Sequence, residues 1–463
     1  MDIVFNKLCK KFFVLILAVM LLFVGCSSEV EDVIEEESKI DTSIEASIKC
    51  ITTEVFAKTE NSEDAPLQLI FNEFKKIYPN ATIKADIVAE EDFVTAVSDA
   101  LKSEEGLDFI IGTPFELSLI AKDNNLADLS SIFRTNKDAE ASTAEGSSKQ
   151  PLGENILSAA SLTASDKKDF YPIAVSANLM AFNKKIVEDA GLLDKLPSGD
   201  DRGWSFDDYK EFILALDEKL PSTIDTGIIY YGTNLVSGTK RLITNAYGAE
   251  FSKGDEIKIN SEQGIKALSG IKDIIDKQAM VNGFTTDVNE NLERFIAGET
   301  AHTIYYNMGI DLSHKDKKKD NFEVVFVPYP SESGAKLDFD TIGAAVFENA
   351  DEDKLELTKA FLKFLADDEA ITSYVVGNMG MYSPYDEYND FLHDEYAYLR
   401  KTISMMDNFE IADNKFDSDF TLALRKIMFL DEDVEEGLND FAKNAASQSS
   451  DKNDEDSEEA TEE

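Results

Sequence analysis

The sequence predicts an α/β protein built from two lobes, and three observations support this fold class. Segments with strand-like and helix-like patterns alternate from residue 47 onward. Between two acidic ends lie roughly 400 residues of mixed apolar and polar composition, a length that favours two cores over one. The stretch YPIAVSANLMAFNKKIVEDAGL (171–192) reads as extended chain that runs into a helix, with Asn183 placed to cap it and Gly191 to close it.

Both ends of the chain are predicted to lie outside the folded part. Residues 1–25 hold three lysines and then an uncharged run from 12 to 24, which is short for a membrane span and typical of a signal peptide. The Gly-Cys pair that follows resembles a lipoprotein signal, in which Cys26 becomes the lipidated first residue. Residues 26–46 are then an acidic tether, and residues 447–463 a disordered acidic tail.

Charge and cysteine content exclude several classes of function. The formal net charge is 45 − 91 = −46, which disfavours nucleic acid and anionic lipid headgroups as partners. The same charge could favour a cationic ligand, although a surface adapted to solubility explains it equally well. With Cys9 in the signal and Cys26 lipidated, Cys50 has no partner, so we expect no disulfide and a small buried strand residue at this position.

The first part of the folded region has a β-α-β-α-β order. Strands are predicted at 47–52, 82–88 and 107–113, and helices at 66–78, at 93–101 and through Leu117 and Ile120. This order predicts a parallel sheet with helices on both faces. Residues 134–153 lack periodicity and are expected to form an exposed loop, followed by a short helix at 154–162.

Residues beyond 171 continue the alternation. Tyr171–Val175 and Asn178–Phe182 are predicted as two short strands, and Ser205 with Asp208 has the spacing of a capping box. Further predicted segments are a strand at 227–232, helices at 239–249 and 264–275, a helix-Gly-strand element at 293–307, strands at 322–330 and 341–347, a helix at 357–370 and an irregular segment at 377–387.

These segments resemble, in order, the bacterial extracellular solute-binding proteins of family 1, the maltose-binding type. The resemblance rests on five features. Two of them are Phe182-Asn183-Lys184 before the capped helix and the single Trp204 at the start of the next helix. The others are Phe295, Gly298, Glu299 and Ala301 in the helix-Gly-strand element, the segment FEVVFVPYP (322–330) and the segment GNMGMYSPYDE (377–387). The position after Ala301 is usually Met in that family and is His302 here. Trp204 is expected to have a structural role, because the family's Trp packs at this place.

The resemblance implies a two-lobe, periplasmic-binding-protein-like fold of type II. Each lobe is then a mixed sheet flanked by helices, and three crossing segments join the lobes. The implied first lobe is 47–170 with 338–380, and the implied second lobe is 171–337 with 381–446. Ligands in open α/β sheets bind beyond the carboxyl ends of strands, so loops of both lobes should face one shared cleft that closes about the crossings.

The implied function is that of a lipid-anchored, extracytoplasmic substrate-binding protein of an ABC importer, with a carbohydrate or oligosaccharide as ligand. The expected partners are this small molecule, the transmembrane permease subunits and the membrane, reached through the N-terminal lipid. We expect a monomer that uses no cofactor or metal, binds no nucleic acid and is not an enzyme.

Candidate ligand-binding residues are polar and aromatic side chains in loops that follow strands. Sugars stack on aromatic rings and bond to fixed polar groups. Maltose-binding proteins carry an acid at the position of Ser176. The candidates are Thr53, Glu54, Phe56, Thr113, Phe115, Glu116, Ser176, Asn178, Asn234, Thr239, Arg241, Tyr305, Tyr306, Asn307 and Tyr382.

Other functions remain open from the residues alone. The same fold could bind a polyamine, which suits the acidic composition, or ferric ion through the tyrosine pairs 230–231 and 305–306. Consecutive strand residues point to opposite faces, which disfavours such pairs as joint metal ligands. A secreted glycoside-acting enzyme would need a carboxylate pair, which so acidic a sequence can always supply. A surface adhesin would need the anchor but not the two-lobe order.

Overall fold

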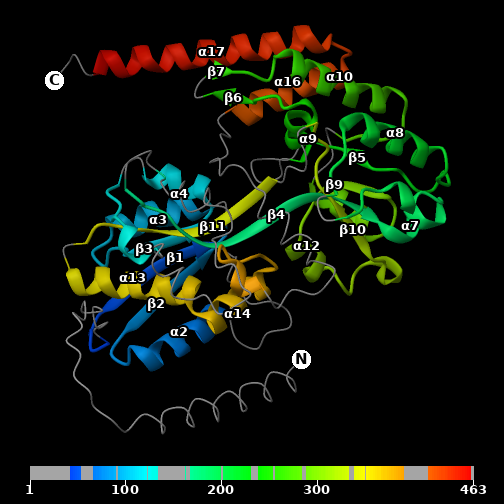
Figure 1. The fold of residues 1–463 in the computed structure, drawn as a ribbon. Coiled ribbons are helices and arrows are strands. Elements are labelled where there is room, and N and C mark those ends of the chain that lie inside the picture. Colours follow the sequence, from blue (N-terminus) through cyan, green and yellow to red (C-terminus); the bar gives the residue numbers. More distant parts are fainter. Residues whose placement is uncertain are drawn as a thin grey trace, which may run out of the picture. The chain divides into compact units, whose positions relative to one another are not determined.

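The computed structural model describes residues 42–53, 66–89, 92–121, 124–133, 162, 167–199, 202–230, 238–253, 256–283, 288–332, 338–349, 351–389 and 416–459. Ser43–Glu463 forms one compact unit, which holds all the elements named below (Figure 1). The predicted signal peptide, residues 26–41 of the predicted tether with Cys26, and the predicted loop at 134–153 lie outside the described residues, as does most of the helix expected at 154–162.

The first strands form a parallel sheet, as the β-α-β-α-β order predicts. β1 (Ser47–Thr53) pairs in parallel with β2 (Thr82–Val88) and with β3 (Phe109–Gly112). The connecting helices are α2 (Pro66–Ile77) and α3 (Phe93–Lys102), and α4 (Pro114–Ala121) follows the last strand.

Helices cover both faces of this sheet because successive strand residues point to opposite sides. Ile48 and Cys50 of β1 pack with α2 and with a later helix, α13 (Glu352–Asp367). Ile51, the next residue, packs instead with α3 and α4. The prediction that Cys50 is a small buried strand residue is confirmed, since only 1% of it is exposed.

β4 (Tyr171–Asn183) is one continuous strand in which all thirteen residues are buried. The prediction of two separate strands is therefore wrong. The apolar pattern weakens at Ser176-Ala177, but β11 (Asp338–Val346) pairs antiparallel along this stretch and keeps the hydrogen-bond ladder intact. The cap by Asn183 on α7 (Lys184–Asp189) is confirmed, because its side chain accepts from the N–H of Ile186.

β4 joins two groups of strands in one mixed sheet. The strands of this sheet follow the order β10-β4-β11-β3-β1-β2, with β9 (His302–Tyr306) also paired to β4. Near its beginning β4 pairs with β11, which continues antiparallel to β3. Near its end β4 pairs antiparallel with β9 and with β10 (Val324–Val327).

The elements between β4 and β11 are mostly helical. They are η4 (Leu193–Lys195), α8 (Phe206–Asp217), β5 (Ile228–Ile229), α9 (Gly238–Tyr247), β6 (Ser252–Lys253), β7 (Glu256–Ile257), α10 (Glu262–Asp276), β8 (Val281–Asn282), α11 (Val288–Ile296), α12 (Met308–Ser313) and η5 (Lys319–Asn321). The predicted capping box at Ser205 and Asp208 is confirmed at the start of α8.

The last elements are α14 (Glu369–Met379), η6 (Asp386–Asn389), α16 (Asp417–Phe429) and α17 (Val434–Glu459), with η3 (Ser130–Ile132) earlier in the chain. α17 continues past residue 446 into the segment 447–463, which is predicted as a disordered tail, and helix rather than disorder is found there up to Glu459. Neither Gly nor Pro occurs between Leu438 and Glu459, so no residue in this stretch is a strong helix breaker.

The buried side chains divide into cores that meet along β4. Tyr171, Ile173 and Ala174 belong to the core formed with α2 and α13, which we call the first-lobe core. Met180 and Phe182 belong to the core formed with α8, α10, α16 and α17, the second-lobe core. The opposite face of β4, with Leu179 at its centre, packs into a smaller set of side chains, which we call the crossing core; it is Ala177, Leu179, Ala181, Phe295, Tyr306, Met308, Phe322, Phe326 and Tyr382.

Candidate functional site

Three chain segments meet at the middle of β4. Val175 pairs with Thr341 of β11 on one side, and on the other it exchanges two backbone hydrogen bonds, of 2.8 and 2.7 Å, with Tyr382. Met381 packs in the first-lobe core, whereas Tyr382 packs in the crossing core. The chain therefore changes cores both in β4 and at Met381-Tyr382.

Asn178 and Asn307, both predicted as site residues, lie together at this crossing. The side chain of Asn307 donates from Nδ2 to Oδ1 of Asn178 at 3.1 Å. Its own Oδ1 accepts from the N–H of Ile310 at 2.9 Å and so caps α12. Asn178 is fully buried and Asn307 is half-buried, so Asn178 supports the position of Asn307.

A β-bulge lies in β9 directly before Asn307. Leu179 pairs with Tyr306 and Ala181 with Thr303, so β9 has one residue more than β4 over this interval. The hydroxyl of Thr303 donates to the carbonyl of Tyr305 at 3.3 Å across the bulge. Bulges re-aim side chains and occur often beside functional sites. Here the bulge turns Tyr305 toward the second-lobe core, where it is half-buried.

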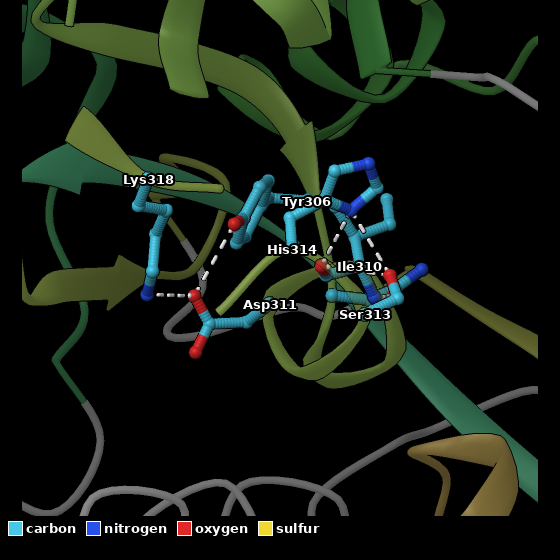
Figure 2. A network of polar contacts seen from close by, with 7 residues as sticks. Tyr306, Ile310, Asp311, Ser313, His314 and Lys318 are labelled. Atoms are coloured by element: carbon cyan, nitrogen blue, oxygen red, sulfur yellow. Dashed lines mark hydrogen bonds and ion pairs between the residues drawn. The ribbon is translucent and has the colours of Figure 1, made fainter. Parts of the chain in front are cut away.

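Tyr306 points into the crossing core instead, and its hydroxyl donates to Oδ1 of Asp311 at 3.2 Å (Figure 2). The same carboxylate pairs with Lys318 Nζ at 2.7 Å. Figure 2 also shows His314, whose Nδ1 lies 3.0 Å from the carbonyl oxygen of Ile310. Because the two tyrosines have different surroundings, they do not form a pair of adjacent phenolates for iron. Tyr231, of the other pair, lies outside the described residues.

The N-terminus of α9 packs directly on this bulge. The hydroxyl of Thr239 donates to the backbone carbonyl of Tyr230, at the end of β5. A Cβ on Gly238 would lie 2.6 Å from the carbonyl oxygen of Ile304, so a residue with a side chain would not fit there. The same oxygen accepts from the hydroxyl of Tyr329 at 2.8 Å. Tyr230 after β5 and Ile304 in the bulge of β9 thus lie next to the start of α9, and Tyr329 after β10 is bonded to Ile304.

Sequence reasoning missed Gly238 and Tyr329 as parts of this arrangement. Gly238 directly precedes the predicted site residue Thr239, and a glycine before a helix start is a recognisable signal of close backbone approach. Tyr329 gives no such signal, because only the fold brings its hydroxyl to the bulge.

In the first lobe, Thr113 and Glu116 form a capping box on α4. The Glu116 carboxylate accepts from the backbone N–H and the hydroxyl of Thr113 at 2.7 and 2.9 Å, and the N–H of Glu116 lies 3.3 Å from Thr113 Oγ1. Burial raises the pKa of Glu116, and the two hydrogen bonds from Thr113 partly offset this effect. The Glu116 carboxylate is therefore turned toward its own helix.

The remaining predicted site residues differ in exposure. Thr53, at the end of β1, and Ser176 are 6% and 7% exposed, while Arg241 is half-buried. Tyr382 is buried at 1%. Outside the described residues lie Glu54, Phe56, Asn234 and the side chain of Phe115.

The described residues contain neither a metal-binding cluster nor a membrane-spanning helix. Within those ranges, no cluster of three or more His, Cys, Asp or Glu side chains has the geometry to hold a metal ion. None of the helices in the described part of the chain combines the length and apolar character needed to cross a membrane.

A mixed sheet flanked by helices, with β4 and the 381–382 segment passing between cores, defines the class of protein: a type II periplasmic-binding-protein-like fold. Residues 57–372, more than half of the chain, match the sequence profile of the bacterial extracellular solute-binding protein family. The chain belongs to this family. A comparison with curated proteins finds no match.

Solved structures share the fold at low sequence identity. The cyclic alpha-maltosyl-1,6-maltose binding protein from Arthrobacter globiformis has a TM-score of 0.67 at 17% identity, with 86% of this chain and 97% of that chain covered. UgpB from Mycobacterium tuberculosis in complex with glycerophosphocholine has a TM-score of 0.66 at 15% identity, with 87% of this chain and 98% of that chain covered. The ABC substrate-binding protein Lmo0181 from Listeria monocytogenes in complex with cycloalternan has a TM-score of 0.63 at 17% identity, with 87% of this chain and 99% of that chain covered.

Proposed function

We propose that this protein is the substrate-binding component of an ABC importer that captures a carbohydrate between its two lobes and delivers it to a membrane permease. The observation that carries the proposal is the passage of β4 between the two cores, with Asn307 and the bulge that aims Tyr305 beside the crossing. Membership of the solute-binding family supports it. Several similar structures are described as binding maltose or other oligosaccharides.

The proposed ligand-binding surface consists of the predicted residues that keep some exposure at the ends of strands. Tyr305 would supply an aromatic face, and Thr113, Arg241 and Asn307 would supply polar groups. Asn178, Glu116 and Thr239 would hold these elements in place through the hydrogen bonds described above. Closure of the lobes would complete the site, and the ligand would shift the population toward the closed state.

The anchoring and cellular location form a second part of the proposal. Lipidation of Cys26 would hold the protein at the outer face of the cell membrane, and the tether at 26–46 would give it reach. Membership of an extracellular family supports an extracytoplasmic location. Binding and release, with no bond broken, would then be the whole chemistry.

A thermal-shift screen tests the ligand class. A ligand that binds only the folded protein stabilises it by RT ln(1 + L/Kd), where L is the free ligand concentration, or about 2.7 kcal/mol at 100 Kd. Oligosaccharides should raise Tm, whereas spermidine, ferric ion and glycerophosphocholine should not. A shift with one of these three and with no sugar would overturn the carbohydrate proposal. Hydrolysis of a stabilising oligosaccharide would favour an enzyme.

Two tyrosine variants test the surface itself. Tyr305→Ala should abolish the oligosaccharide shift, and Tyr305→Phe should keep most of it, because stacking needs only the ring. Tyr247→Ala is the matched control, since Tyr247 is also half-buried against the second-lobe core but lies at the far end of α9. Equal loss in Tyr247→Ala and Tyr305→Ala would show general destabilisation and contradict the assignment of Tyr305.

A further inference from the structure

Two glycines from different parts of the fold touch through their backbones at the crossing. Gly309 is the second residue of α12, and Gly380 ends α14 in the left-handed conformation, with φ +63°. A Cβ on Gly380 would lie 2.4 Å from Gly309 Cα and 2.8 Å from Gly309 N. A Cβ on Gly309 would lie 2.9 Å from the carbonyl oxygen of Met379. At this contact no side chain separates the two helices.

The two helices belong to different cores. α14 contributes Val375 and Val376 to the first-lobe core, whereas α12 contributes Met308 to the crossing core, which packs on the second half of β4. The chain leaves Gly380 directly for the Met381-Tyr382 change of core. Asn307, the residue that caps α12, is bonded through its side chain to Asn178 of β4. The glycine contact therefore joins α14, which packs in the first-lobe core, to α12, which packs in the crossing core.

We propose that the Gly309–Gly380 contact is a pivot that sets the angle between the two lobes. A contact between side chains can absorb a small change by a change of rotamer, but a contact between two backbones cannot. An added methyl group must therefore separate α12 from α14. Because this contact is next to the crossing, a small separation here rotates one lobe against the other. The proposal deepens the proposed function, on which it rests for the role of lobe motion.

The consequence for binding is a change in affinity that follows from the lobe angle. Gly380→Ala is the cleaner test, because a Cβ on Gly309 would also lie 3.3 Å from Oδ1 of Asn307, a proposed ligand-binding residue. Ligand affinity depends on the fraction of molecules in the binding-competent arrangement as well as on the contacts themselves. Neither glycine is among the candidate ligand-binding residues. Their substitution should shift the unliganded balance between open and closed forms, and the apparent Kd should shift with it.

The experiment measures the distance between the lobes in the absence of ligand. Fluorophores on Lys75→Cys in α2 and Lys219→Cys after α8, both exposed positions, report this distance by single-molecule energy transfer. The labelled protein starts at residue 26 and carries Cys26→Ser, so that this cysteine is not labelled. Cys50 is buried and should not react with the fluorophore. We expect Gly309→Ala and Gly380→Ala to displace the distance distribution of the wild type, in the same direction for both.

Two control variants separate the pivot from general effects of replacing glycine. Gly106→Ala introduces the same left-handed strain, at φ +68°, where no atom lies within 4 Å of the new Cβ. Gly270→Ala introduces an equal overlap, 2.4 Å from the Phe206 ring, but inside the second-lobe core. Both controls should leave the distance distribution unchanged.

An unchanged distribution in folded Gly309→Ala and Gly380→Ala would overturn the pivot. So would loss of folding in both while the two controls fold, because that would reveal a fixed packing contact. The readout needs no ligand and is therefore independent of the ligand class. Failure of the proposed function would instead appear as a wild-type distance that no screened compound changes.

Discussion

The imidazole of His302 stacks on the ring of Phe182, with centroids 4.4 Å apart and an interplanar angle of 30°. Both rings are fully buried in the interior of the second lobe, and neither nitrogen of His302 has a hydrogen-bond partner among the described residues. Burial lowers the pKa of His302 to about 3. The imidazole is thus held neutral and fills an apolar position in the second-lobe core.

Replacing His302 by Met should remove a pH-dependent loss of stability. The unfolded chain takes up a proton on this residue below its ordinary pKa of 6.5, but the folded protein does so only near 3. Stability is therefore complete above pH 6.5 and falls as the pH drops toward 3. From pH 8 to pH 5 the loss from this one group is about 2 kcal/mol. Urea unfolding of wild type and His302→Met at both pH values measures it.

Carboxylates titrate in both proteins, so their contribution cancels in the comparison. The free energy of unfolding of His302→Met minus that of wild type should be about 2 kcal/mol larger at pH 5 than at pH 8, which means that the variant gains in relative stability at pH 5. If this difference were the same at pH 5 and pH 8, His302 would take up its proton as readily in the folded protein as in the unfolded chain.

The capping box of Thr113 and Glu116 should contribute to stability as one unit. Thr113→Ala and Glu116→Ala should each lower the free energy of unfolding by about 1 kcal/mol, and the double variant by less than the sum. Ser205→Ala, in the matched capping box of α8, sets the scale. Should Glu116→Ala abolish ligand binding and leave stability intact, Glu116 would be a ligand-binding residue after all.

The strand and helix order was predictable from local patterns because each element of the first lobe carries its own periodicity. β2 has the predicted bounds, and the cap at Asn183 follows from a local signal. The continuity of β4 was not predictable, because the partner that holds Ser176-Ala177 in the ladder is β11, more than 160 residues further along the chain. Long-range pairing overrides a local interruption here.

Some features of the candidate site could likewise be predicted from the sequence, and others could not. Thr113-x-x-Glu116 has the capping-box spacing, so the role of its carboxylate could have been inferred from sequence. That the two tyrosines 305 and 306 point to opposite faces follows from strand alternation. Which of them faces the second-lobe core could not be inferred, since this depends on the bulge in the register of β9 against β4. The meeting of Gly309 with Gly380 is likewise a product of tertiary packing, as isolated glycines in two helical segments carry no sign that they touch.

Cys50 should be unreactive in the native protein. Its thiol is buried, and burial raises its pKa well above the ordinary value, so little nucleophilic thiolate is present. Thiol titration with Ellman's reagent at pH 8 should give the same value for wild type and Cys50→Ala under native conditions. In guanidinium chloride the wild type should gain one thiol over the variant. A faster native reaction of the wild type would reveal local opening of β1.

The ion pair between Asp311 and Lys318 should be the most sensitive electrostatic interaction near the crossing. Their side chains are 11% and 7% exposed, and the carboxylate also accepts from Tyr306. Lys318→Met leaves a buried carboxylate without its cation, and we expect a loss of about 3–5 kcal/mol in the free energy of unfolding. Asp311→Asn with Lys318→Met removes both charges and should recover part of that loss.

Lys185→Met provides the control for loss of a lysine charge. Lys185 pairs with Asp189 across one turn of α7, but both side chains are more than 60% exposed, so water compensates the loss and stability should not change measurably. Chemical unfolding of the four proteins, including wild type, gives the comparison. If Lys318→Met were as stable as Lys185→Met, water would have to reach the carboxylate of Asp311. The loop from α12 to β10 would then be open rather than held closed by its buried ion pair.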